Sequence, residues 1–226
     1  MPERSAMQVN PVDVSCFLAG ITRLFSLPLM LVIWHRKTGA RIRPALVAFA
    51  VCFPVFFTGA AIRAGFSTDD FLGFYIRQGF LYGILEEGAK YLALRFLIPT
   101  CDSREDAVSY GIGHGMIEEY SAGISCIGLI GAGTADPDIF FFALFAVIEG
   151  AASTIALTVL IAYGIRMGKS KIMLPAAILL HAAGNMAVGI LIEPAAVAVR
   201  AVLTAGACFA AYRCWQAMQE PYGNDW

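Results

Sequence analysis

Seven long apolar stretches constrain this chain more than any other feature of its sequence. An α-helix needs about 20 mostly apolar residues to cross a bilayer, and each stretch reaches that length. They predict transmembrane helices at about 12–34, 45–66, 71–98, 107–132, 139–165, 172–192 and 195–216. The connections between them are too short for a soluble domain. The sequence therefore predicts one all-α integral membrane domain, a polytopic helical bundle over residues 1–226.

The composition agrees with a lipid environment. Hydrophobic residues make up 58% of the chain and charged residues only 15%, whereas soluble domains carry about 25% charged residues. The net charge of −1 offers no broad basic surface, which argues against nucleic acid as a partner. The chain is therefore expected to be a multi-pass protein of the cell membrane.

Lysine and arginine residues predict the orientation, because cytoplasmic loops carry an excess of them. They gather in the first, third and fifth connections, whereas the second, fourth and sixth are acidic or neutral. The basic residues of the first, third and fifth connections are Arg36, Lys37, Arg41, Arg43, Arg104, Arg166, Lys169 and Lys171. This bias predicts the N-terminus outside and the C-terminus in the cytoplasm.

Several apolar stretches nevertheless contain ionisable or strongly polar residues. A charge at the bilayer centre costs at least about 2.5–3.5 kcal/mol, so each such residue needs a partner or a function. Those that can contribute to a buried site are Glu86, Glu87 and Lys90 in the third stretch, His114, Glu118 and Glu119 in the fourth, Glu149 in the fifth, and His181 and Asn185 in the sixth.

Helix geometry predicts that four of these residues share one layer of the membrane. At 1.5 Å per residue, Glu86, His114, Glu118 and His181 lie about 10–18 Å from the cytoplasmic ends of their helices. Glu149 lies deeper, at about 24 Å on the same scale, and is assigned a supporting role. The layer lies slightly on the cytoplasmic side of the midplane.

Spacing adds to this expectation, because residues four apart share a helix face. The pairs at this spacing are Glu86 with Lys90, His114 with Glu118, and His181 with Asn185. Three helices would thus each present a polar pair to a common site. Glu87 with Lys90 is interpreted as a buried structural ion pair.

These residue types suit peptide hydrolysis. The reaction needs a water, a base that activates it and donors for the developing oxyanion; burial makes a glutamate a stronger base, and His and Asn supply donors. The chain has no His-Glu-x-x-His motif, no pair of intramembrane aspartates and no Gly-x-Ser-Gly in a span. A peptidase built from carboxylates and histidines remains.

At these residues the chain resembles the YhfC-type intramembrane peptidases, which are related to the CAAX prenyl protease and bacteriocin-processing superfamily and to PrsW-like proteases. The matching segments are Glu86-Glu87-Gly-Ala-Lys90, Gly111-Ile-Gly-His114-Gly-Met-Ile-Glu118 and His181-Ala-Ala-Gly-Asn185. The related superfamily often has an arginine one position beyond the place of Lys90.

The resemblance implies a role for each matching residue. Glu86 would be the water-activating base, with Glu87 beside it sharing the proton load, and His114 would position the water. His181 and Asn185 would face the oxyanion. The implied substrate is a membrane-embedded or lipid-anchored peptide or protein.

A metal-free mechanism is favoured from the sequence, with zinc as the alternative. The zinc set would be His114, Glu118 and His181, which leaves an open fourth position. Against zinc, only Glu149 or Glu119 is evident as a carboxylate that would orient either histidine.

Two other functions fit the composition of the spans. A proton- or cation-coupled transporter also needs intramembrane ionisable residues, but the chain has no evident internal repeat, and its polar residues form one layer. A catalytically inactive scaffold of the same fold is the third possibility.

Overall fold

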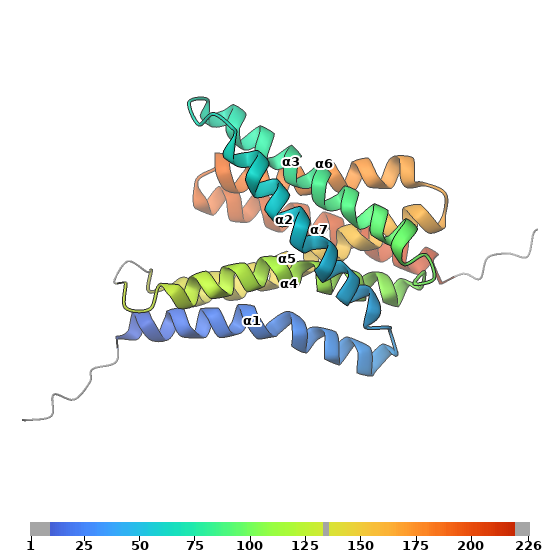
Figure 1. Cartoon of the computed structure of the whole chain (residues 1–226), viewed down its shortest axis with the longest axis horizontal. Helices are drawn as coiled ribbons and strands as arrows, with labels where there is room; N and C mark the ends of the chain where they lie inside the picture. Colours follow the sequence, from blue (N-terminus) through green and yellow to red (C-terminus); the bar gives the residue numbers. More distant parts are fainter. Residues whose placement is uncertain (1–9, 133–135, 220–226) are drawn as a thin grey trace, which may run out of the picture.

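The computed structural model describes residues 10–132 and 136–219, and these residues form a bundle of seven α-helices (Figure 1). The helices are α1 Pro11–Thr38, α2 Arg43–Ala64, α3 Phe71–Leu92, α4 Arg104–Gly128, α5 Ile139–Arg166, α6 Ser170–Ile190 and α7 Glu193–Ala217. A π-helical turn, η1 (Ala93–Leu97), continues α3. The predicted all-α class with seven helices is confirmed. A segment of the predicted fourth connection, residues 133–135, lies outside the described residues, as do residues 1–9 and 220–226.

Local sequence explains where several helices begin and end. Asn10, Asp70 and Ser103 each cap a helix by accepting a hydrogen bond from a backbone N–H of the first turn. Gly39 ends α1 with a φ of 71°, a left-handed conformation that favours glycine. Turn chemistry therefore limits the helices close to the ends of the apolar stretches.

Five helices are long and apolar enough to cross a membrane by themselves, namely α1, α2, α5, α6 and α7. The other two, α3 and α4, carry most of the ionisable residues of the predicted site. Helix α4 is covered by α1, α2 and α5, and α3 lies along α6. Large apolar side chains such as Phe25, Leu46 and Phe141 are exposed on the outside of the bundle, as expected for contact with lipid. The chain is a multi-pass integral membrane protein.

Glycines let α3 and α6 approach closely. A Cβ atom on Gly83 would lie 2.8 Å from the carbonyl oxygen of Ile178, and one on Gly79 would lie 2.9 Å from that of Ala182. No larger residue fits at these positions without a shift of backbone. This contact holds the segment that carries Glu86 against the segment of α6 that begins one turn before His181.

The connections gather at two opposite ends of the bundle (Figure 1). The first, third and fifth connections lie at one end, here named the basic end; the second, fourth and sixth lie at the other, here named the acidic end. The orientation of these ends in a membrane stays a prediction: the basic end in the cytoplasm.

Cysteine labelling in intact cells checks this orientation. We expect cysteines at positions 69 and 136, in place of Asp69 and Asp136, to react with an impermeant thiol reagent added outside. Cysteines in place of Lys37 and Lys169 should react only after the membrane is opened. Labelling of position 37 from outside would contradict the orientation.

Candidate functional site

Helices α3, α4 and α6 bring Glu86, His114 and His181 together. The Nε2 atom of His114 lies 3.1 Å from Oε2 of Glu86, and the Nε2 atom of His181 lies 3.9 Å from the same oxygen. Glu86 and His114 are buried. Two imidazoles therefore face one carboxylate oxygen, at the shared depth that the helix counts predicted.

A second carboxylate joins this group from α4. One atom of each of Glu86, His114 and Glu118 that could bind a metal, a carboxylate oxygen or a ring nitrogen, lies within 4.8 Å of the other two. Glu118 differs from the other two because it is exposed; with Glu86 it lines a cavity. Two carboxylates and an imidazole at this spacing form a possible site for a divalent metal ion.

Glu87 occupies a different position from its neighbour in sequence. Its Oε1 atom accepts a hydrogen bond from Nζ of Lys90 at 2.7 Å and lies 2.6 Å from Nδ1 of His181. Glu87 and Lys90 are almost completely buried, with 0% and 1% of their surface exposed. The predicted ion pair of Glu87 and Lys90 is present, and it extends to His181.

This arrangement corrects one argument drawn from the sequence. The sequence indicates Glu149 or Glu119 as the carboxylate that orients a histidine, but Glu119 binds Arg23 at 2.9 Å and Glu149 pairs with Arg200. The carboxylate that orients His181 is Glu87. Sequence spacing does not reveal it, since the contact joins α3 to α6 across 94 positions.

The contact with Glu87 also limits what His181 can do. Its Nδ1–H donates a hydrogen bond to the carboxylate, so a neutral ring presents a lone pair at Nε2, on the side of Glu86. Carboxylate–histidine pairs of this kind orient metal-binding histidines in many zinc sites. A neutral His181 is thus suited to hold a metal ion, and it becomes a donor at Nε2 only when protonated.

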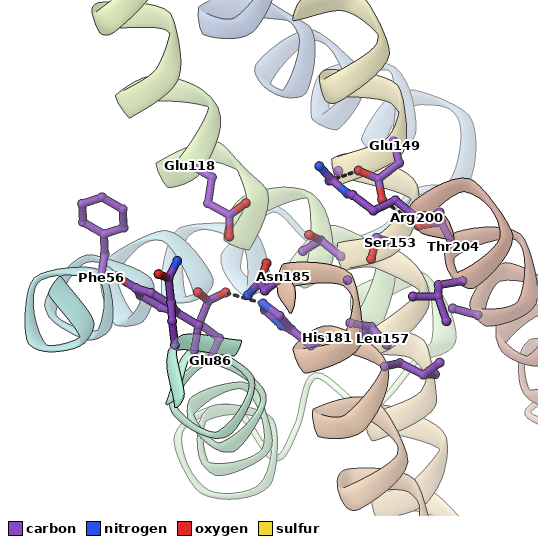
Figure 2. Close-up of a pocket in the computed structure, with 18 of the residues that line it drawn as sticks. Phe56, Glu86, Glu118, Glu149, Ser153, Leu157, His181, Asn185, Arg200 and Thr204 are labelled. Carbon is purple, nitrogen blue, oxygen red and sulfur yellow. Dashed lines mark hydrogen bonds and ion pairs between the residues drawn. The ribbon is translucent and has the colours of Figure 1, made fainter. Parts of the chain in front are cut away.

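A cavity of about 280 Å³ gives access to the site. The residues Glu86, Glu118, His181 and Asn185 line it, and Figure 2 shows their side chains. Asn185 lies one helical turn after His181, as predicted. His114 is 1% exposed and reaches Glu86 from the packed interior.

One contact of His114 and one unpaired atom of its ring were missed in the sequence. The Sγ atom of Cys52, on α2, lies 3.9 Å from its Nε2 atom. The Nδ1 atom of His114 is buried and has no hydrogen-bond partner among the described residues. No sequence pattern links Cys52 to the site, because α2 otherwise looks like a purely apolar span.

Arg200 of α7 is the other residue that sequence reasoning missed. It lines the cavity beside Glu149, with which it forms an ion pair. The signal was available, because Arg200 is a charged residue within the last apolar stretch and such residues need a partner or a function. Glu149, assigned a supporting role, is therefore a neighbour of Arg200 on the cavity wall (Figure 2).

Comparison with known proteins gives one match. No curated protein and no solved structure matches the chain. A family model does match residues 53–131, which run from within α2 to the segment after α4 and include Glu86, Glu87, Lys90, His114 and Glu118. The family is described as YhfC intramembrane metalloprotease, so the resemblance inferred from the third and fourth helices is confirmed.

Proposed function

We propose that the chain is an intramembrane peptidase that hydrolyses a peptide bond of a membrane-embedded or lipid-anchored substrate. The observation that carries this proposal is the group formed by Glu86, His114 and Glu118 beside a cavity that His181 and Asn185 also line. A base, polar donors and space for water are thus available together at membrane depth. The family description supports the same reaction class.

Glu86 is proposed as the proton acceptor. Its Oε2 atom is turned to His114, which orients the carboxylate beside the cavity. Glu86 takes a proton from the attacking water and returns it to the leaving amine. Asn185 donates an amide N–H to the oxyanion of the tetrahedral intermediate.

Glu87 and Lys90 are proposed to position His181. Lys90 and His181 both bind to the Oε1 atom of Glu87, and Glu87 is completely buried and does not line the cavity, so it is a poor candidate for the base. Lys90 balances its charge inside the bundle. By binding Nδ1, Glu87 fixes Nε2 as the ring nitrogen of His181 that is turned to Glu86.

The described residues fit a zinc ion. Two neighbouring carboxylates in a poorly hydrated site need a shared proton or a cation, and the permanent cation nearby, Lys90, is paired with Glu87. The ligand atoms that lie together come from Glu86, His114 and Glu118; in the set expected from the sequence, His181 would take the place of Glu86 as the third ligand and would leave Glu86 as the base. Zn²⁺ would supply a Lewis acid for the attacking water. Both the Glu87–His181 contact and the family description favour this alternative over the metal-free mechanism.

Metal analysis distinguishes the two mechanisms. We expect purified protein to hold about one zinc ion per chain, and the His114→Ala variant to lose it without unfolding. Elemental analysis and thermal stability measure these two properties. A metal-free wild-type protein that cleaves peptide in a strong chelator would instead support Glu86 with a protonated His181 as the oxyanion donor.

Reconstitution in vesicles separates a peptidase from a transporter. Purified protein should cleave a membrane-embedded peptide and should not carry protons or cations across the same vesicles. Mass spectrometry of the products and a pH-sensitive dye inside the vesicles give the two readouts. Ion flux without any cleavage would contradict the proposed function.

A further inference from the structure

A second charged group lines the cavity that contains the Glu86 site. Arg200 of α7 pairs with Oε2 of Glu149 on α5, and Thr204 donates a hydrogen bond to the other oxygen, Oε1, at 2.7 Å. Both oxygens of Glu149 therefore have partners inside the protein. Figure 2 shows this group on the other side of the cavity from Glu86.

Arg200 keeps donors for a ligand. A guanidinium group has five N–H donors, and the contact with Glu149 is made through Nη2. The side chain of Arg200 is 31% exposed and lines the cavity. Glu149 and Thr204 thus hold the guanidinium in place and leave some of its donors facing the space where a substrate would lie.

Arg200 lies nearer than Glu86 to the acidic end of the bundle. Measured along the helices from that end at 1.5 Å per residue, Arg63 is at about 2 Å, Arg200 at about 10 Å and Glu86 at about 22 Å. All three residues line the cavity. The cavity therefore extends from Glu86 toward the acidic end.

The charges along this path are unevenly distributed. Glu86 makes the inner end of the cavity acidic and Arg63 and Arg200 make its outer end positive, with Glu118 and Glu149 between them at about 15 Å on the same scale. In a poorly hydrated cavity such a difference favours one polarity of ligand. An anionic group fits the outer end and is repelled from the inner end.

We propose that Arg200 determines specificity by receiving a carboxylate of the substrate, across the cavity from Glu86. The inference rests on the proposed peptidase function and adds a substrate class to it. Arginine is suited to this role because its planar donors match the two oxygens of a carboxylate. The carboxylate comes either from an Asp or Glu side chain or from a free C-terminus.

A binding experiment tests this proposal independently of cleavage. The Glu86→Gln protein, in nanodiscs, is titrated with fluorescent leucine-rich 20-residue peptides in four forms: ending in a carboxylate or an amide, each with Asp or Asn near that end. We expect at least one carboxylate form to bind about tenfold or more tightly than its neutral counterpart, the size of a hydrogen bond to a charged group. The form with the larger ratio identifies the source of the carboxylate.

The control removes the guanidinium without stranding its partner. Arg200→Met alone leaves Glu149 unpaired and is expected to reduce stability, so Glu149→Gln with Arg200→Met is made in the same Glu86→Gln background. The preference for carboxylate should disappear in this variant, and binding of the neutral peptides should remain. Equal binding of all four peptides, no binding of any, or a preference that survives loss of Arg200 would overturn the proposal. Failure of the peptidase proposal itself is seen separately, as absence of cleavage by the wild-type protein.

Discussion

Glu86→Gln is expected to reduce peptide cleavage by at least about 10²–10⁴-fold, the usual effect of losing a general base. Glutamine keeps the size of the side chain and its ability to contact Nε2 of His114, which lies 3.1 Å from the carboxylate. It cannot accept the proton of water. The rate of cleavage in vesicles and the melting temperature are measured on the same preparation.

A matched variant separates this effect from a general loss of negative charge. Glu193 lies in the first turn of α7, at the acidic end and away from the cavity lining, so Glu193→Gln should cleave at the wild-type rate. A Glu86→Gln protein of normal stability that still cleaves at that rate would remove the basis of the proposed mechanism.

Lys90→Ala should lower stability by about 3–5 kcal/mol, the cost of leaving a buried charge without its partner. Lys90 and Glu87 are 1% and 0% exposed, and their side chains lie 2.7 Å apart. Removal of the ammonium strands the carboxylate among packed helices. The yield and the denaturant concentration at the midpoint of unfolding should therefore fall before any change in the intrinsic rate is measurable.

The double variant Glu87→Gln with Lys90→Met is the control, because it removes both charges. It should recover most of the lost stability yet still cleave poorly, because Glu87 also contacts His181. A Lys90→Ala protein as stable as the wild type would mean that the pair contributes little.

Hydrophobic length and helix geometry explain what could be predicted from the sequence. Apolar stretches define helices because every backbone polar group in a bilayer must be satisfied within the protein. The rise per residue then gives depth, which is why Glu86, His114 and His181 were expected in one layer and lie within hydrogen-bond or ion-pair range of one another.

Which partner each side chain finds depends on how the helices are rotated, and a linear pattern does not contain this information. Glu86 and Glu87 are adjacent in sequence but about 100° apart around the helix, so one faces His114 and the other contacts His181 and Lys90. The role of Arg200 likewise depends on where α7 packs against α5. The residue types of the site and the Glu87–Lys90 pair within one helix were therefore predictable, and the contacts between side chains of different helices were not.

The glycine contact between α3 and α6 has a consequence for how a substrate can enter. Because the backbones meet at Gly79 and Gly83, these two helices have no side chains at those positions that could rearrange, and the spacing of Glu86 and His181 is set by the backbone itself. A misplacement of about 1 Å can reduce a rate 10²-fold, so this pair of helices keeps the distance between Glu86 and His181 constant. If the bundle widens to admit a substrate, the helices that move are those without such contacts. Helix α7 is one of them, because a Cβ on Gly206 would meet open space.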